Sequence, residues 1–186
     1  LKERAETGRI YIMNLDHCNS HSSFKDKVSM SNLCQEITLP TTPIQDIHDE
    51  QGEIALCILS AVNVGGLNDL SELENICDLS VRALEQIIDY QDYPVKAAEV
   101  STKRRRSLGI GYIGLAHYLA KNGVKYSDPK AWDLVDRLSE AFQYYLLVAS
   151  NDLAQERGAC EGFSRTKYAD GILPIDTYKK DVDDVI

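Results

Sequence analysis

The apolar run at residues 54–59 is the feature that most constrains the fold of this chain. Six consecutive apolar side chains present no polar face to solvent, so residues 53–64, closed by Gly65 and Gly66, predict a strand buried on both faces. Such strands are typical of α/β folds, in which helices cover both sides of a sheet. Residues 9–15 are β-branched and aromatic and predict another buried strand.

Helical periodicity replaces these strand patterns across residues 71–158, which we predict to be the helical region of the chain. The first helix begins at Ser71, because Ser71 and Glu74 have the spacing of a capping box. Its apolar stripe consists of Leu73, Ile76, Cys77, Val81, Leu84, Ile87 and Ile88. Tyr93 and Pro94 end this part of the sequence, because a proline disfavours helix in the residue before it.

Two further helices are predicted after a basic run at residues 103–106, which has the composition of an exposed connector. One helix covers residues 107–121. The other has Asp128 as its N-cap and ends near Gly158. The apolar side of this last helix consists of Trp132, Val135, Leu138, Phe142, Tyr145, Leu146 and Leu153. Strands followed by helices indicate one α/β unit that includes all of residues 1–186.

The net charge and the cysteine content limit the classes of partner and the compartment expected for the chain. Twenty basic and 29 acidic residues give a net charge of −9, which disfavours nucleic acid and anionic membranes. The longest apolar run is far shorter than the roughly 20 residues that cross a bilayer. Five cysteines without a C-x-x-C pair indicate a reducing, cytoplasmic setting. The first residues contain neither a start methionine nor a signal core, so we expect a piece of a longer polypeptide.

Asn32, Cys34 and Glu36 form the most informative polar cluster in the sequence. In an extended segment alternate side chains share one face, so these three would point one way and Leu33 and Gln35 the other. Neighbouring members would lie about 6 to 7 Å apart, which is the size of a sugar. An amide, a thiol and a carboxylate would then converge on one small molecule, although a pentapeptide of this polarity is more often an ordinary loop.

Four other groups have a structural interpretation beside the chemical one. Cys57 lies in the apolar run, where cysteine usually acts as a small buried hydrophobe. Residues 109–114 match G-x-G-x-x-G, but without a preceding strand we favour close packing over nicotinamide binding. Residues 16–21 contain metal-ligand residue types without a second cluster, so no metal is assigned. Tyr145 is predicted to lie in the core and Tyr144 at its boundary.

Several segments, taken together, resemble the large subunit of class I ribonucleotide reductase. These segments are LKERA at 1–5, TGRIY at 7–11, SNLCQEI at 31–37, LPT at 39–41, GEIALC at 52–57, DYQDYP at 89–94, LGIG at 108–111 and GILPIDTY at 171–178. The combination of N-x-C-x-E with a second cysteine in a strand-like ALC segment is highly specific. The resemblance extends over essentially the whole chain.

The resemblance implies that residues 1–186 are part of a ten-stranded α/β barrel, with residues 31–39 as a finger loop at its centre. By position in the motif, Cys34 becomes a thiyl radical that abstracts the 3′ hydrogen of the ribose. Glu36 takes the proton of the 3′-hydroxyl, and Asn32 hydrogen-bonds the sugar. Cys57 resembles one member of the thiol pair that supplies two electrons. The implied substrate-binding residues are Asn32, Leu33, Cys34, Gln35 and Glu36.

The same resemblance implies the partners of the chain. A metal-containing small (β) subunit supplies the radical, and thioredoxin or glutaredoxin restores the thiols. ATP and deoxynucleotide effectors bind parts of the family chain that are absent here, so this segment is expected to bind no cofactor or metal. The partner of Cys57 would lie before Leu1, and the relay tyrosines and phosphate-binding loop after Ile186. The isolated segment is therefore expected to be inactive without the remaining α-chain segments.

Two other interpretations stay open. Another thiyl-radical barrel, such as a cobalamin-dependent reductase or a glycyl-radical enzyme, would keep the cysteine and change the source of the radical. A non-catalytic scaffold fragment would keep the fold and need none of Asn32, Cys34 and Glu36. A cobalamin requirement would identify the first alternative, and an active variant lacking all three side chains would identify the second.

Overall fold

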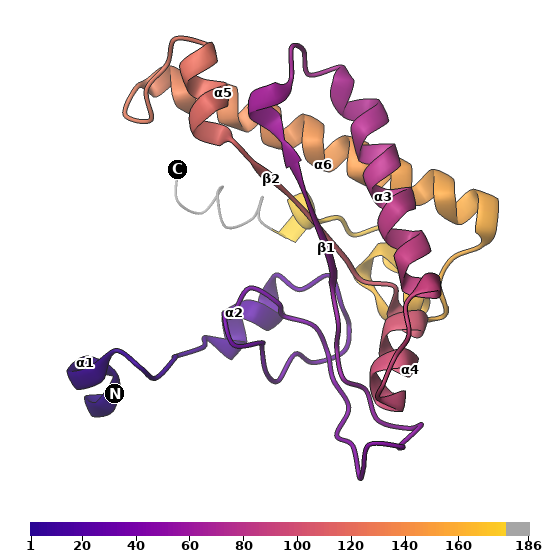
Figure 1. Cartoon of the computed structure of the whole chain (residues 1–186). Coiled ribbons are helices and arrows are strands. Elements are labelled where there is room, and N and C mark those ends of the chain that lie inside the picture. Colours follow the sequence, from indigo (N-terminus) through magenta and orange to yellow (C-terminus); the bar gives the residue numbers. More distant parts are fainter. Residues whose placement is uncertain (178–186) are drawn as a thin grey trace. The chain divides into compact units, whose positions relative to one another are not determined.

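The computed structural model describes residues 1–177, which contain both helices and strands (Figure 1). The described residues divide into two compact units. The first contains Leu1–Ala55, Val95–Ser101 and the described residues from Glu161 onward, and the second contains Leu56–Pro94 and Thr102–Cys160. The prediction of an α/β chain is confirmed, and each unit is considered by itself below.

The second unit is built on two parallel strands, β1 (Ile58–Asn63) and β2 (Leu108–Ile113), which run side by side in Figure 1. A short 3₁₀ helix, η1 (Val64–Gly66), follows β1. The strand predicted at residues 53–64 is therefore confirmed but shorter. The prediction that it is buried on both faces is wrong, because alternate residues of β1 are exposed. Among the described residues β1 pairs with β2 alone, and α3 packs against both strands.

The helix predicted from residue 71 is α3 (Glu72–Tyr90). Its apolar stripe is confirmed except at Ile87, which is 42% exposed. Its buried side chains are Leu73, Cys77, Val81, Leu84 and Ile88. The predicted capping box is wrong, because Ser71 already has helical backbone angles and its hydroxyl makes no cap bond. The backbone N–H of Ser71 instead donates to Asp69 Oδ1 at 2.8 Å, and that of Asn68 donates to Glu72 Oε1 at 3.2 Å.

The last predicted helix is α6 (Pro129–Arg157), and both of its ends are confirmed. Asp128 caps it by accepting a hydrogen bond from the backbone N–H of Lys130, and Gly158 ends it. Trp132 was expected on the apolar side, but it is 74% exposed. Neighbouring helical residues point about 100° apart, and at this turn Ala131 takes the buried position.

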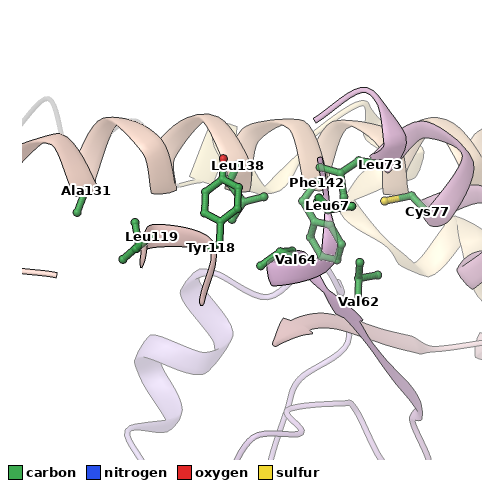
Figure 2. Close-up of a cluster of buried hydrophobic side chains, with 10 residues drawn as sticks. All are labelled: Val62, Val64, Leu67, Leu73, Cys77, Tyr118, Leu119, Ala131, Leu138 and Phe142. Atoms are coloured by element: carbon green, nitrogen blue, oxygen red, sulfur yellow. The ribbon is translucent and has the colours of Figure 1, made fainter. Parts of the chain in front are cut away.

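The hydrophobic core of the second unit lies between η1, α3, α5 (Leu115–Lys121) and α6 (Figure 2). Its buried members are Val62, Val64, Leu67, Leu73, Cys77, Tyr118, Leu119, Ala131, Leu138 and Phe142. The ring of Tyr112 on β2 packs edge-on against Phe142, with 5.5 Å between ring centroids. Tyr145 packs against this core, as the sequence predicts, but Tyr144, predicted at the boundary of the core, is 61% exposed.

The region between α3 and α6 departs most from the sequence prediction. The basic run at 103–106 was expected to be an exposed connector, but its first three residues complete the helix α4 (Lys96–Arg105). Residues 107–121 were expected to form one helix, but they form β2 and then α5. Gly114 separates these two elements with φ +80°, a value that side-chain-bearing residues rarely adopt. Pairing with the distant strand β1 outweighs the local helical pattern here.

Arg106 follows the end of α4 and forms ion pairs with two acidic side chains of α3 within the second unit. Its guanidinium donates to Glu85 Oε1. It also forms a bidentate pair with Asp89, in which Nη1 lies 3.0 Å from Oδ1 and Nη2 lies 2.8 Å from Oδ2. The Arg106 side chain is mostly buried, at 19% exposure. This hydrogen-bonded pairing lowers the pKa of the Asp89 carboxyl. The end of the basic run thus meets acidic groups of its own chain.

We expect Arg106→Gln to destabilise the contact between α3 and the segment that directly follows α4 by about 1 to 3 kcal/mol, the range for hydrogen bonds to charged groups. Amide hydrogen exchange in Glu72–Tyr90 should become faster, and the increase measures the lost stability of this contact. Arg82→Gln is the matched control, because Arg82 pairs with Asp78 and Glu156 at a more exposed site, where about 1 kcal/mol or less is expected. Equal increases of hydrogen exchange in both variants would contradict the larger stabilising role of Arg106.

The Arg106 pair also predicts a pH dependence of that exchange. A carboxyl whose pKa is lowered by folding stabilises the native state above its unfolded pKa, about 3.9 for aspartate. The contribution disappears as pH falls through the lowered native pKa. Arg106→Gln should flatten this acid-side dependence of exchange in α3, although Asp89 is 55% exposed and the effect is correspondingly small.

The first unit contains short helices joined by extended chain. They include α1 (Lys2–Thr7), α2 (Leu15–Ser20), η2 (Glu161–Arg165) and η3 (Lys167–Asp170), and residues 96–101 of α4 also belong to this unit. The strand predicted at residues 9–15 is wrong: residues 9–14 are not part of a strand, and Ile10, Tyr11 and Ile12 are exposed. A strand requires a paired neighbour, and none of the described residues pairs with this segment.

Candidate active site

Two pairs of backbone contacts hold the ends of the loop that contains the predicted site. At one end, the Asn19 side chain accepts from the backbone N–H of Val28 and donates to its carbonyl, both at 2.9 Å. Val28 is completely buried. At the other end, Thr42 and Glu53 exchange backbone hydrogen bonds, and the Thr42 hydroxyl donates to Glu53 Oε2 at 2.9 Å. The loop is therefore anchored on both sides in the first unit.

The loop reverses direction at residues 32–35, so the extended conformation expected there is wrong. The backbone N–H of Gln35 donates to the Asn32 carbonyl at 3.1 Å, and Gln35 has φ +62°. The Asn32 side-chain oxygen also accepts from the backbone N–H of Ile37 at 3.1 Å. Asparagine side chains that bond nearby backbone groups compete with extended structure, which explains the turn. Asn32, Cys34 and Glu36 therefore do not lie along one face of a straight strand.

The turn joins two of the three predicted catalytic side chains directly. Asn32 Nδ2 donates to Glu36 Oε1 at 2.5 Å. The Ser31 hydroxyl closes the same turn by donating to the Ile37 carbonyl at 2.7 Å. Because Asn32 binds one carboxylate oxygen, the second oxygen of Glu36 is left to accept a proton or a hydrogen bond from a ligand. The amide thus orients the carboxylate.

Cys34 lies in the turn between these two residues and is exposed. Leu33 beside it is 79% exposed, while Gln35 is partly buried. A thiol at the tip of an anchored loop is accessible to a partner or substrate, in contrast to a cysteine that fills a core. Among the five predicted substrate-binding residues, the structure therefore presents Asn32, Leu33, Cys34 and Glu36 at the surface of the first unit.

Cys57, the predicted redox-active cysteine, belongs to the second unit and comes directly before β1. Its side chain is partly buried, and this burial raises the pKa of the thiol. The sulfur is therefore a protonated thiol at neutral pH, which suits a hydrogen and electron donor better than a nucleophile. Cys57 is less buried than a typical core cysteine. Cys77 is the core cysteine of this unit, because it is fully buried in the cluster of Figure 2.

The other sequence candidates take structural positions. The first two glycines of the G-x-G-x-x-G match lie inside β2 rather than after a strand, so the nicotinamide-binding geometry is not formed. Residues 16–21 lie mainly on α2, and within residues 1–177 no group of three or more His, Cys, Asp or Glu side chains is placed to hold a metal. In that part of the chain no helix combines the length and apolar character of a membrane span.

Sequence reasoning missed the residues that shape the site rather than perform chemistry. Asn19 and Ser31 position the loop through hydrogen bonds to backbone groups, and their residue types are common in any loop. Gln35 gives no signal for its positive φ, since glycine or asparagine usually marks such positions. Gly109 belongs to the glycine motif, but the sequence does not show that Cys57 and Leu59 lie beside it on the neighbouring segment.

The chain belongs to the ribonucleotide reductase barrel-domain family, whose model matches residues 1–185. It is 62% identical over 98% of its length to the ribonucleoside-diphosphate reductase subunit alpha of Haemophilus influenzae. Identity is 58% to the ribonucleoside-diphosphate reductase 1 subunit alpha of Escherichia coli and 40% to the ribonucleoside-diphosphate reductase subunit alpha of Enterobacteria phage T4, each over the whole chain. The chain spans about a quarter of these relatives, 24 to 25% of their length.

Proposed function

We propose that this chain forms the central part of a ribonucleoside-diphosphate reductase α subunit and carries its radical-forming cysteine. The observation that supports this most directly is the turn in which exposed Cys34 lies between Asn32 and Glu36, with the amide bonded to the carboxylate. Membership of the barrel-domain family supports the same assignment. The reaction converts a ribonucleoside diphosphate to the deoxyribonucleotide.

In the proposed reaction, a Cys34 thiyl radical takes the 3′ hydrogen atom of the ribose, which leaves a carbon radical on the sugar. Glu36 accepts the 3′-hydroxyl proton as a general base, and this helps the 2′-hydroxyl to leave as water. Asn32 holds the carboxylate and donates to the sugar hydroxyls. Leu33 and Gln35, on either side of Cys34, complete the contact with substrate. At the end of the cycle the hydrogen atom returns from Cys34 to C3′.

Cys57 is proposed to be one of the two thiols that supply the reducing equivalents. Oxidation of two thiols to a disulfide releases two electrons and two protons, and these balance the loss of the 2′-hydroxyl as water. Thioredoxin or glutaredoxin, each a dithiol, then reduces the disulfide by exchange. The raised pKa of Cys57 keeps this sulfur protonated until it reacts.

The proposed setting is larger than the described units. Residues 1–186 would contribute to one ten-stranded barrel domain, with residues 31–39 as the finger loop and the parallel pair β1–β2 as part of its wall. The remaining α-chain segments complete the barrel and bind the nucleotide effectors. A β subunit with a metal centre supplies the radical, and the complex works in the cytoplasm without nucleic acid or a membrane.

The deciding experiment assembles the complete α chain that contains this sequence with its β subunit and measures deoxyribonucleotide formation. Production of deoxyribonucleotide that depends on the β subunit supports the proposal. A requirement for cobalamin instead would identify the other thiyl-radical class. Activity that survives simultaneous replacement of Asn32, Cys34 and Glu36 by alanine would leave the segment only a scaffold role.

A second test follows Cys57 during a single turnover. The complete α chain is first reduced, freed of reductant and allowed to turn over with substrate and β subunit, and its peptides are then mapped by mass spectrometry. We expect Cys57 to end in a disulfide in proportion to the product formed, while Cys77, whose thiol is fully buried, stays free. A Cys57 thiol that remains free after product has formed would exclude its redox role.

A further inference from the structure

Gly109 lies on β2 directly opposite the segment that contains Cys57. The parallel register pairs Gly109 with Leu59, and the backbone N–H of Ile58 donates to the Ser107 carbonyl at 3.3 Å. Cys57 and Leu59 are two residues apart, so their side chains flank the same position on the neighbouring strand. Both belong to the second unit, as does Gly109.

The space above Gly109 is filled by these two side chains. A Cβ atom built on Gly109 would lie 2.8 Å from Cys57 Sγ and 2.5 Å from Leu59 Cδ2. Favourable contacts between non-bonded atoms lie at about 3.5 to 4.0 Å, so even one methyl group at this position requires both neighbours to move. Gly109 does not have a positive φ, so its backbone alone does not require glycine.

The two neighbours differ in how they can move. Leu59 is 59% exposed, and its Cδ2 atom is the far end of a side chain that can rotate toward solvent. Cys57 has a single side-chain torsion, so its sulfur can leave only by changing to another staggered rotamer or by shifting the strand. The absence of a side chain at 109 therefore leaves free the space that Sγ occupies.

We propose that Gly109 is a positioning residue for Cys57: it leaves the space that holds Sγ in the rotamer from which this sulfur forms its disulfide. The inference rests on the proposed redox role of Cys57. Disulfide formation is sensitive to such placement, because two Cβ atoms must approach to about 3.5 to 4.5 Å with a restricted torsion about the S–S bond. A sulfur moved to another rotamer points away from its partner.

The test is the substitution Gly109→Ala in the complete α chain, with Gly111→Ala as the matched control. Gly111 lies on the same strand, and a Cβ there meets no atom within 4 Å. In the single-turnover experiment, we expect Gly109→Ala to slow disulfide formation at Cys57 by about 10-fold to 100-fold, the scale for a reacting group misplaced by roughly 1 Å. Gly111→Ala should stay within about twofold.

A readout other than overall rate separates positioning from general destabilisation. The proposed substrate-binding side chains are those of residues 32–36 and do not include Cys57 or Gly109, so the dissociation constant for substrate should be unchanged in Gly109→Ala while the turnover number falls. Release of the sulfur from its partly buried place should also increase the rate at which iodoacetamide alkylates Cys57 at neutral pH. Equal slowing of Gly109→Ala and Gly111→Ala would overturn the inference.

The double variant Leu59→Ala and Gly109→Ala keeps the inference testable if the single variant folds poorly. Removing the leucine side chain relieves the contact with Cδ2 and leaves the contact with Sγ. We expect this folded double variant to keep the slow disulfide formation. If it forms the disulfide at the wild-type rate, Gly109 serves only packing and the inference is wrong. A wild-type Cys57 that never enters a disulfide would instead refute the proposed function itself.

Discussion

Cys34→Ser in the complete α chain is expected to lower deoxyribonucleotide formation by about 10⁴-fold or more, the scale seen when an enzyme loses the side chain that forms its reactive intermediate. Serine is close in size to cysteine, but its O–H bond is stronger than an S–H bond and does not yield an equivalent radical. The measurement is the turnover number with saturating substrate and β subunit. Turnover within about tenfold of wild type would contradict the radical assignment.

The structure makes this variant a clean chemical test. Cys34 is exposed in a turn that is closed by hydrogen bonds of Asn32 and Ser31, and none of those bonds uses the Cys34 side chain. The melting temperature and the affinity for substrate should therefore change little. Cys18→Ser is the matched control, because Cys18 is a half-buried cysteine of α2 in the same unit. It should retain activity within about twofold, as expected for a substitution outside the site.

The helices with local end signals could be predicted from the sequence. Asp128 and Pro129 start α6 and Gly158 ends it, and all of these signals act within a few residues of the helix ends. The burial pattern of α3 follows equally from its own periodicity. These elements are specified by contacts along the chain or by one continuous apolar face, so their positions do not depend on distant partners.

The strands could not be predicted with the same success, because pairing decides them. Residues 108–113 carry two glycines and read as the start of a helix, yet their register against β1 makes them a strand. Residues 9–15 have a stronger strand composition and form none within the described chain. Strand composition measures how well a side chain fits a sheet, and the sheet itself is supplied by residues far away in sequence.

For the candidate site, resemblance identified the residue types and the structure supplied a different geometry. A straight segment would have placed Asn32 and Glu36 far apart on one face. The turn instead brings their side chains into direct contact, because the backbone N–H groups of Gln35 and Ile37 donate to the backbone carbonyl and the side-chain oxygen of Asn32. Such bonds are short-range but depend on the exact path of the loop, which Asn19 fixes through its bonds to Val28.

This contact leads to the second large effect, expected for Glu36→Gln. Glutamine keeps an oxygen that can accept from Asn32 Nδ2, so the turn should persist, while the basicity of the carboxylate is lost. Loss of a general base costs about 10²-fold to 10⁴-fold, and we expect the turnover number to fall by that factor while substrate affinity changes little. The measurement is the turnover number of the complete α chain with its β subunit.

Rate and affinity together separate a base from a residue that only holds the loop. A lower turnover number with unchanged substrate affinity indicates loss of the base, because glutamine keeps the acceptor for the Asn32 hydrogen bond. Glu50→Gln is a matched control, since Glu50 is an exposed carboxylate outside the turn. If Glu36→Gln kept the wild-type rate, the carboxylate would have no role in proton transfer, and Asn32 would be left to orient the sugar alone.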